Sequence, residues 1–421
     1  MKVLHLAGSH ASTYYFGVSM MYAFGCVRAF VEADAEIHDE GEHTQNAVLL
    51  ANRDGTWSVF DNADTFLKFA ASHKADPGHE HPLARWTLPE AMSEISRMPS
   101  SSSTGGCDVV QPHMFCFDGM TLHRSIAGFL GLPLVGSEGS TMALTTHKWQ
   151  TRAIVESHGV RCPKAQLLLR RAGAGSDSDD DDDAAAAKRA MSDLTMEPPF
   201  LIKPAREDNS LGISLVMSRD KILEALQTAL QFDDELLVEQ FIPLGRELRV
   251  GVIDTSDKKG DGLEFLSGME YFLGHKSQPI RTSADKISTD TSNGLSVDFA
   301  PTERQIPADL DAVLLAKLQT LAKTSHKALG CRHYSLYDIR VCPDGEPYFI
   351  ECSPYCSFSP DSAIAVMGSP TYGEGATGAC TKLFKRLAKK AIAEHGGNSP
   401  ENDSTGKPAQ VMGMRARSSL R

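Results

Sequence analysis

The chain has 421 residues and a mass of 45.6 kDa, which at about 100–200 residues per domain predicts two or three domains. Its 42 basic and 54 acidic residues give a formal net charge of −12, which excludes a global positive field attracting nucleic acid or an anionic membrane. The sequence contains no run of eighteen apolar residues that would indicate a membrane span. Residues 1–8 favour a strand and turn over a signal peptide. We therefore expect a soluble, cytoplasmic protein without nucleic-acid or membrane partners.

The nine cysteines indicate a reducing compartment. They form no CxxC pair and no spacing typical of a zinc site, and their number is odd. Disulfide frameworks are typical of short secreted chains. We therefore expect free thiols.

The first third of the chain predicts an α/β layer. Strand-like segments alternate with turn residues, and a mainly apolar stretch over 15–31 predicts a helix directly after the first strand. The pair Asp54-Gly55 suits a hairpin turn between two of the strands. The Ser-rich run over 99–106 predicts a loop, because nothing in it can pack against a core. The expected strands cover 2–7, 48–51, 56–60, 108–110 and 132–135.

The middle of the chain combines a helix with a low-complexity insertion. Residues 142–158 have helical periodicity, and Gly159 is placed as a C-terminal stop. Residues 172–190 contain consecutive aspartates followed by consecutive alanines, and we expect this segment to be disordered. The aspartates lack the glycine turn and alternating ligands of a calcium loop, so a solvated run is the favoured interpretation.

The rest of the chain predicts further strands and two helices before a polar end. Residues 396–421 contain Gly, Ser, Pro and charged residues without apolar periodicity, which indicates a disordered tail. The expected strands cover 200–203, 236–239 and 248–253, the helices cover 308–329 and 381–393, and a hairpin occupies 334–353.

The hairpin is the most informative segment, because it brings two carboxylates face to face. If Asp344-Gly345 forms a two-residue turn, Asp338 lies opposite Glu351, and Arg340 faces Phe349 on the same side. Like charges in that position repel, so a cation between them is expected, and hard oxygen ligands suit Mg²⁺ or Mn²⁺ carrying phosphates. The alternative is a pair of carboxylates at a solvated surface of the sheet.

Other charged residues would complete a nucleotide site, although each has an ordinary interpretation by itself. Lys203 ends an apolar strand before a polar loop, where an ammonium can reach a phosphate. Lys148 alone would be a solvated helix residue. Glu239 and Glu247 flank Phe241-Ile242, where a buried strand turns polar, as an adenine pocket requires. An ordinary strand-to-loop junction is the alternative there.

The order of these residues resembles an ATP-grasp enzyme, and specifically a relative of the D-alanine–D-alanine ligases. The resemblance covers roughly residues 2–390 outside the Ser-rich and Asp-rich insertions. It implies an α/β ATP-grasp fold in which an N-terminal Rossmann-like domain precedes two α+β subdomains that clasp ATP. The segments that carry it are Lys148, Lys203-Pro204, Val238-Glu239-Gln240-Phe241, Glu247, Asp338 and Glu351-Cys352-Ser353-Pro354.

The same resemblance implies a division of the chain into domains. An N-terminal α/β domain would cover 1–137, and a central ATP-grasp subdomain 138–240 would include the disordered insertion. A C-terminal ATP-grasp subdomain would cover 241–395, followed by the tail.

The resemblance also implies roles for individual residues. Contacts with ATP are implied for Lys148, Lys203, Lys286, Glu239, Phe241, Ile242 and Glu247, with the adenine held by Glu239 and the backbone of 241–242 and the ribose by Glu247. Mg²⁺ would be bound by Asp338, Glu351 and Ser353. The catalytic groups would be Arg340, Ser210 and Lys286, and contacts with the substrates would come from Ser362 and His113.

Several residues depart from the pattern of the ligases. Leu336 stands where they carry an arginine two residues before the metal aspartate, and Arg340 is the candidate to substitute for it. Ser353 replaces an asparagine metal ligand, and Asp208 brings negative charge into the phosphate-covering loop. Residues 1–31 contain no acid, although the ligases use a glutamate there to hold the first substrate's ammonium, so the donor pocket has changed.

We therefore expect an ATP- and Mg²⁺-dependent carboxylate–amine ligase. It would join two small amino-acid-like molecules through an acyl phosphate and release ADP and phosphate, and it could form a homodimer. The alternative is an ATP-binding pseudoenzyme or regulatory protein with weak or no ligase activity, because Leu336 and Ser353 would impair transfer.

Overall fold

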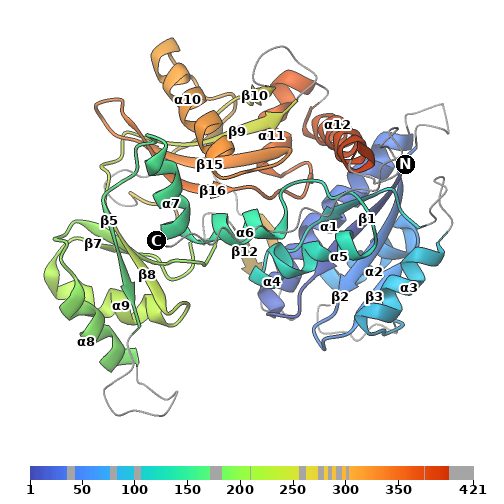
Figure 1. Cartoon of the computed structure of the whole chain (residues 1–421), viewed down its shortest axis with the longest axis horizontal. Helices are drawn as coiled ribbons and strands as arrows, with labels where there is room; N and C mark the ends of the chain where they lie inside the picture. Colours follow the sequence, from blue (N-terminus) through green and yellow to red (C-terminus); the bar gives the residue numbers. More distant parts are fainter. Residues whose placement is uncertain are drawn as a thin grey trace, which may run out of the picture.

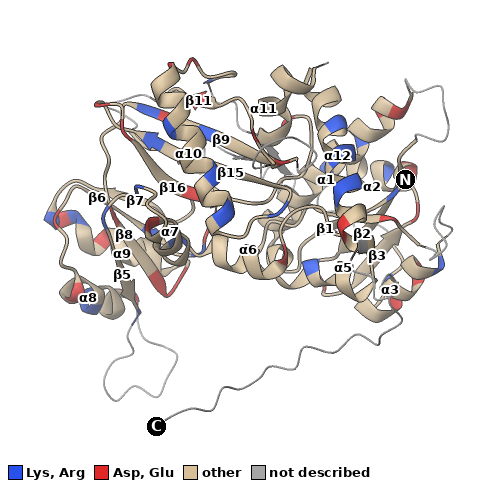
Figure 2. Ribbon diagram, turned by 45° about the horizontal axis from the view of Figure 1, so that its top comes forward, with Lys and Arg blue, Asp and Glu red and all other residues tan. Residues whose placement is uncertain are grey.

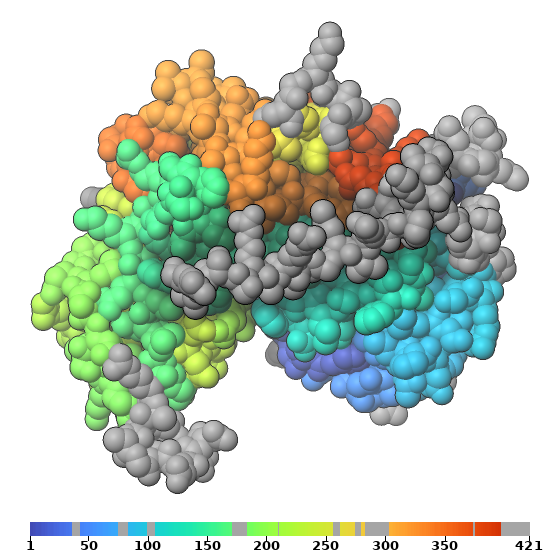
Figure 3. All heavy atoms as spheres, viewed as in Figure 1, coloured from blue at the N-terminus to red at the C-terminus, as the bar shows by residue number. Residues whose placement is uncertain are grey.

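The computed structural model describes residues 1–35, 43–75, 83–98, 106–170, 183–208, 210–255, 262–273, 279–282, 287–290, 296–299, 303–373 and 375–397. Figure 1 shows three parts, each built around one sheet: the blue and teal N-terminal part, the green central part, and the orange C-terminal part above both. In the space-filling view of Figure 3 the C-terminal part lies against the other two.

The N-terminal part is a three-layer α/β/α unit. Its sheet has the order β3-β2-β1-β4, in which β1 pairs in parallel with β2 and β4, and β3 is antiparallel to β2. Successive side chains of the strands point to opposite faces and are apolar on both, so both faces of the sheet are buried. Helices α1 and α2 cover one face, and α3 and α5 cover the other. The strands are β1 (Lys2–Gly8), β2 (Gln45–Ala51), β3 (Trp57–Phe60) and β4 (Val109–Pro112). The helices are α1 (Thr13–Ala35), α2 (Ala63–Ala75), α3 (Leu88–Arg97), α4 (Phe117–Met120) and α5 (Ser125–Phe129).

The expected elements of this part are present with one exception. The β2–β3 hairpin turns at Asp54-Gly55 as expected. The strand expected over 132–135 is only an isolated bridge between Leu134 and Val110, because the segment makes a brief parallel contact with β4. The Ser-rich run over 99–105 lies outside the described residues.

Helix α1 meets the length and hydropathy of a membrane span, with a mean hydropathy of 1.2 over an eighteen-residue window. Half of that window is buried inside the protein. Its buried side chains, including Phe16, Ala23 and Val27, pack in the same cluster as Val48 and Leu50 of β2. This is the packing expected of a core helix in an α/β layer.

The single helix expected over 142–158 is two helices, α6 (Gly139–Thr146) and α7 (Lys148–Ser157). His147 between them has an extended backbone, with φ −89° and ψ 97°. The hydroxyls of Thr146 and Thr151 donate to the carbonyl oxygens of Ala143 and Leu144, which satisfies acceptors at the end of α6. The Lys148 N–H donates to the Ala205 carbonyl. The break makes Lys148 the first residue of α7.

The central part is an antiparallel sheet covered on one face by two helices. The strand order is β5-β8-β6-β7, and the apolar side chains of α8 and α9 bury one face of it. The other face bears Leu201, Lys203 and Glu239, and it borders the cleft described below. The elements are β5 (Ala165–Leu169), α8 (Asp183–Asp193), β6 (Phe200–Pro204), β7 (Ser214–Val216), α9 (Ile222–Leu230) and β8 (Glu235–Gln240).

The expectation of disorder over 172–190 is wrong for its second half. Residues 183–190 belong to α8, and Ala186, Ala187 and Ala190 are buried against the central sheet and α9. Alanine has the highest helix propensity, and its small side chain allows the helix to pack closely. The stretch before Asp183, residues 171–182, lies outside the described residues.

The C-terminal part contains a larger sheet of order β14-β11-β9-β15-β16, with β10 also paired to β9. Helix α10 covers one face, and α11 and α12 pack near the end of the other. The strands are β9 (Arg246–Asp254), β10 (Leu263–Phe265), β11 (Met269–Tyr271), β14 (Arg304–Gln305), β15 (Tyr334–Val341) and β16 (Pro347–Ser353), and β12 (Ile287–Asp290) with β13 (Ser296–Phe299) forms a separate pair. The helices are α10 (Ala312–Ala328), α11 (Ala363–Tyr372) and α12 (Gly375–Gly397).

The β15–β16 hairpin has the expected pairing at the carboxylates, but for a different reason. Asp338 lies opposite Glu351, whereas Arg340 lies opposite Tyr348 rather than Phe349. The turn is one residue longer than expected, and an irregularity after Asp338 shifts the register back by one residue. The two shifts cancel at Asp338 and Glu351.

Helix α12 joins the C-terminal part to the N-terminal part through its basic residues. Figure 2 shows Lys and Arg along this helix. Lys385 Nζ lies 3.1 Å from Asp34 of α1, and Lys390 Nζ lies 3.5 Å from Asp254 of β9. The positive side chains of α12 therefore bridge two parts of the protein.

Gly8 and Gly55 both have a positive φ but differ in their surroundings, so replacing each with alanine tests how closely the end of β1 is packed. Gly8 and Gly55 have φ values of +83° and +84°, but a Cβ at Gly8 would meet the Ala51 carbonyl oxygen at 2.2 Å, whereas nothing lies within 4 Å at Gly55. The Ala51 oxygen is held by the Ser9 N–H at 3.1 Å. We expect Gly55→Ala to lower the free energy of unfolding by about 1 kcal/mol and Gly8→Ala by about 3 kcal/mol or more. Equal losses in urea denaturation would contradict this packing.

Candidate active site

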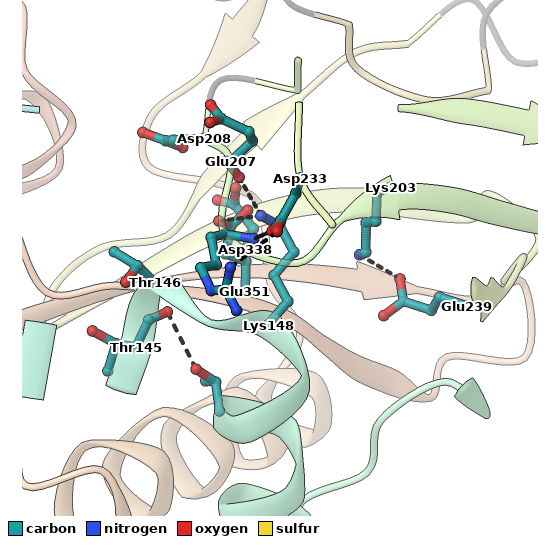
Figure 4. Close-up of polar contacts among 12 residues, drawn as sticks. Thr145, Thr146, Lys148, Lys203, Glu207, Asp208, Asp233, Glu239, Asp338 and Glu351 are labelled. Carbon is teal, nitrogen blue, oxygen red and sulfur yellow. Dashed lines mark hydrogen bonds and ion pairs between the residues drawn. The ribbon is translucent and has the colours of Figure 1, made fainter. Parts of the chain in front are cut away.

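A cleft lies between the central sheet and the C-terminal sheet, and it gathers seven of the fourteen site residues expected from the sequence. Its empty volume is about 560 Å³. Strands β6, β9, β15 and β16, the start of α7 and the loop before β7 supply its lining, and Figure 4 shows several of these side chains. The lining residues are Lys148, Leu201, Lys203, Ser210, Ile213, Glu247, Ile280, Arg281, Asp338, Arg340, Ile350 and Glu351.

Asp338 and Glu351 lie side by side on paired strands, as the hairpin predicted, and each has a basic partner. Arg249 on β9 is the cross-strand neighbour of Asp338 and holds it with Nε–Oδ1 and Nη2–Oδ2 distances of 2.5 and 2.9 Å. Lys148 Nζ lies 3.7 Å from Glu351 Oε1. The break before α7 directs Lys148 to this place, because it makes the lysine the first residue of the helix.

A smaller cavity of about 300 Å³ adjoins the cleft at its other end and is lined by Glu239, Phe241, Ile242 and other residues. Lys203 Nζ donates to Glu239 Oε1 at 2.7 Å, and both side chains are almost fully buried. Breaking a buried ion pair costs several kcal/mol unless a new partner arrives. A ligand that separates Lys203 from Glu239 must therefore provide an anion for the lysine, whereas Glu239 keeps Arg152, whose Nη1 lies 3.9 Å from Glu239 Oε2.

Glu247 and Arg340 form a second ion pair across β9 and β15. Arg340 Nε lies 2.6 Å from Glu247 Oε2, and Arg340 Nη1 donates to the Pro279 carbonyl at 3.0 Å. Burial raises the pKa of the Glu247 carboxyl above its usual value, and the positive charge of Arg340 opposes that rise. Arg340 therefore pairs with Glu247 and not with Asp338.

The loop between β6 and β7 reaches the cleft and is held by tyrosines of other segments. Tyr15 of α1 donates to Glu207 Oε2 at 2.9 Å, and Tyr355 donates to Asp208 Oδ2 at 2.6 Å. Lys148 donates to the Glu207 carbonyl oxygen. Burial raises the pKa of the Glu207 carboxyl, and the hydrogen bond from Tyr15 opposes that rise. The Asp208 carboxylate therefore faces Tyr355 in this structure.

Four of the expected site residues line neither the cleft nor the adjoining cavity, or lie outside the described residues. His113 is fully buried and lies beside His5, with a ring nitrogen distance of 2.8 Å. Ser362 caps α11 and donates its hydroxyl to the Ser359 carbonyl at 2.5 Å, and Ser353 is buried at the end of β16. Lys286 lies outside the described residues.

The His113 imidazole is part of a hydrogen-bonded chain in the N-terminal core. The Asn46 amide nitrogen donates to the Thr44 carbonyl, so its Oδ1 accepts from His5 Nε2 at 2.9 Å. His5 Nδ1 is then the acceptor for the His113 Nε2 proton. Burial lowers the pKa of His5 to about 4 and that of His113 well below its usual value. Both rings are therefore neutral.

Sequence reasoning missed several residues that line the cleft or contact its lining. Arg249 was assigned only to a strand, yet its alternation with Glu247 on β9 places both side chains on one face, and this was a usable signal. Arg281, whose guanidinium carbon lies 3.6 Å from the ring centre of Tyr271, sits in a polar loop without periodicity. The apolar lining of Ile213 and Ile350 also followed no recognisable motif.

The residues present fit Mg²⁺. Asp338 and Glu351 offer carboxylate oxygens on adjacent strands, and the hydroxyl of Ser353 lies two residues farther along β16. Hard oxygen donors in small number suit Mg²⁺ that also binds phosphate oxygens. Ser353 does not line the cleft, so the match to Mg²⁺ rests on the carboxylates of Asp338 and Glu351.

Comparison with known proteins relates the chain to D-alanine–D-alanine ligases. A family model described as D-ala D-ala ligase C-terminus matches residues 175–369. The D-alanine–D-alanine ligase of Pelobacter propionicus is 28% identical over 228 residues, which cover 54% of this chain and 62% of the relative. That of Bordetella petrii is 27% identical over 266 residues, which cover 62% of this chain and 70% of the relative. The chain thus spans less than two thirds of the Pelobacter propionicus relative.

Solved structures agree over nearly the whole chain. The D-alanine–D-alanine ligase from Coxiella burnetii has a TM-score of 0.67 at 17% identity and covers 94% of this chain and 95% of its own. The VanG D-Ala:D-Ser ligase from Enterococcus faecalis has a TM-score of 0.66 at 20% identity and covers 92% of this chain and 99% of its own. At these identities the likeness establishes the fold. The chain therefore has the ATP-grasp fold of the D-alanine–D-alanine ligases, and it is similar to them in sequence over part of its length.

Proposed function

We propose that the protein is an ATP- and Mg²⁺-dependent ligase that joins the carboxylate of one small amino-acid-like molecule to the amine of another. The observation that carries the proposal is the convergence of Lys148, Lys203, Glu247, Asp338 and Glu351 on one cleft from segments far apart in the sequence. Two of these groups are cations suited to phosphates, and two are the oxygen ligands that Mg²⁺ prefers. The D-alanine–D-alanine ligase from Bacillus anthracis, which shares the fold with a TM-score of 0.59, was solved with ATP.

In the proposed reaction a carboxylate oxygen of the first substrate attacks the γ-phosphorus of ATP. The bond from that phosphorus to the β–γ bridging oxygen breaks, so ADP leaves and an acyl phosphate forms. The amine of the second substrate then attacks the acyl carbon, phosphate departs with its bonding electrons, and the nitrogen loses a proton. Bound Mg²⁺ would supply positive charge next to the phosphates.

The residues of the cleft divide this work by position. Lys148 and Lys203 bind phosphate oxygens, and Glu247 accepts hydrogen bonds from the ribose. At the smaller cavity, Glu239 and the backbone of 241–242 hold the adenine, which would release Glu239 from Lys203 as that lysine gains a phosphate. Asp338 and Glu351 hold the metal, with Ser353 as a further oxygen donor.

The remaining roles rest on the family resemblance and stay predictions. Arg340 and Ser210 line the cleft and are assigned to the transferred phosphoryl group together with Lys286. Ser362 and His113 are assigned to the substrates. The proposal also takes over the domain boundaries after 137, 240 and 395, the cytoplasm as the compartment and a homodimer as the assembly.

Phosphate release tests the function directly. Purified protein is incubated with Mg·ATP and a panel of D- and L-amino acids, singly and in pairs, and the products are identified by mass. We expect release that depends on one pair and a product whose mass equals the sum of the two less water. ATP binding without release under any condition would contradict the ligase and would indicate the pseudoenzyme.

Loss of one metal carboxylate should stop the reaction without unfolding the protein. We expect Glu351→Gln to lower Mg²⁺-dependent turnover by roughly 100-fold or more, because the amide is a weaker metal ligand and carries no charge. Glu346→Gln is the matched control, since Glu346 belongs to the same hairpin but pairs with Lys317 and Arg161 away from the cleft. Turnover of the Glu351 variant at the level of the control would contradict the metal assignment.

The raised pKa of Glu247 predicts a pH dependence of nucleotide binding. The ionised carboxylate accepts hydrogen bonds from ribose hydroxyls, and it becomes protonated as the pH falls through a pKa above that of an ordinary glutamate. We therefore expect calorimetry to show weaker ATP binding as the pH is lowered from about 8 to about 5. Glu247→Gln should bind ATP more weakly and remove this part of the slope. The same slope in the variant and the wild type would contradict the assignment.

A further inference from the structure

Four charges form a row at the cleft, of which Lys148, Asp338 and Glu351 line it and Arg249 lies beside Asp338. Arg249 on β9, Asp338 on β15 and Glu351 on β16 occupy facing positions of three neighbouring strands. Lys148 at the start of α7 completes the row next to Glu351. The strand register and the helix start therefore determine an order of one cation, two carboxylates and one cation.

The contact at the Arg249 end is a two-point ion pair. Its Nε and Nη2 each bind a different oxygen of Asp338, and the two side chains are 19% and 13% exposed. Such a planar fork orients the carboxylate as well as balancing its charge. Any cation that binds Asp338 from the cleft shares this carboxylate with Arg249.

The charges of the row cancel. Asp338 and Glu351 together carry two negative charges, and Arg249 and Lys148 carry two positive charges. From these four charges a free divalent cation therefore meets no net attraction, and the guanidinium beside Asp338 repels it. A metal that arrives on a nucleoside triphosphate carries excess negative charge with it, and Lys148 and Lys203 attract that complex.

We propose that Arg249 is a positioning residue that orients Asp338 and balances its charge, so that Mg²⁺ enters bound to the nucleotide and not as the free ion. The inference rests on the proposed function in taking Asp338 and Glu351 as metal ligands. It adds Arg249 to the residues of the proposed metal site, and it adds that the metal and the triphosphate enter together.

A purely structural role for Arg249 predicts a different result. If the guanidinium only ties β9 to β15, its loss loosens the sheet and weakens every ligand of the cleft. If it balances Asp338, its loss leaves a net negative charge in the row and free metal binds more tightly. The sign of the change in metal affinity therefore separates the two accounts.

The test measures binding of Mn²⁺ alone to the full chain by electron paramagnetic resonance. We expect Arg249→Gln to bind free Mn²⁺ at least about tenfold more tightly than the wild type. Arg249→Lys, which keeps the charge, should remain within about threefold of the wild type. An affinity of Arg249→Gln that is unchanged or weaker would overturn the inference.

A matched control comes from the same strand. Arg246 holds Glu270 of β11 with two contacts of 2.8 and 2.5 Å, away from the cleft lining. Arg246→Gln removes a similar two-point pair and should leave Mn²⁺ affinity unchanged, and equal tightening in this control would overturn the inference. If Arg249→Gln does not fold, Lys148→Gln removes the other positive charge of the row, and the same tightening is expected. Its absence would overturn the inference.

The same measurement separates this inference from the proposed function, because it uses neither substrates nor turnover. If the wild type makes an amide product and Arg249→Gln binds Mn²⁺ with the affinity of the wild type, the role of Arg249 is contradicted and the ligase function is not. A tenfold gain in Arg249→Gln, with no amide product from the wild type, would support Arg249 and contradict the ligase.

Discussion

The repulsion between Asp338 and Glu351 is the constraint to which the rest of the cleft responds. The two carboxylates are placed side by side by strand pairing, so neither can move away without breaking the sheet. Partly buried like charges need compensation, which the protein provides with Arg249 on one flank and Lys148 on the other. The same need for positive charge makes the pair suitable for a divalent metal.

Elements from all three parts of the molecule contribute to this arrangement. The extended backbone at His147 starts α7 at Lys148 and aims that lysine at Glu351. The β6–β7 loop is tied to α1 by Tyr15 and to the segment after β16 by Tyr355. Contacts from the N-terminal part and from the segment after β16 therefore hold the loop that borders the cleft.

Pairs of charged side chains recur along the cleft. Lys203 binds Glu239, and Arg340 lies against Glu247. Each pair satisfies two buried charges in the absence of a ligand, and each contains one group suited to a phosphate or hydroxyl of a nucleotide. Binding would then exchange internal partners for ligand groups, which limits the cost of burying so many charges.

Much of this architecture could be predicted from local patterns, and the failures have physical causes. Alternating strands and an Asp-Gly turn located the β15–β16 hairpin, but its register at Glu351 was right only because a longer turn and an irregular pairing cancel. The break at His147 depends on threonine hydroxyls and on Ala205 from a distant loop, which periodicity does not report.

Composition predicted some features of the structure correctly and others wrongly, and individual contacts could not be predicted from the sequence. The acidic, alanine-rich insertion looked disordered, because its composition did not reveal that Ala187 packs against the central sheet. The nine cysteines are free, as their number and spacing predicted. Arg249 could not be paired with Asp338 in advance, since that contact depends on which strand lies beside β15.

Diffraction from crystals grown with Mn²⁺ and a non-hydrolysable ATP analogue tests the central claim most directly. The account predicts an anomalous peak in contact with Asp338 and Glu351, with the triphosphate beside Lys148 and Lys203 and the adenine next to Phe241. A nucleotide bound elsewhere, or a metal without contact to either carboxylate, would contradict it.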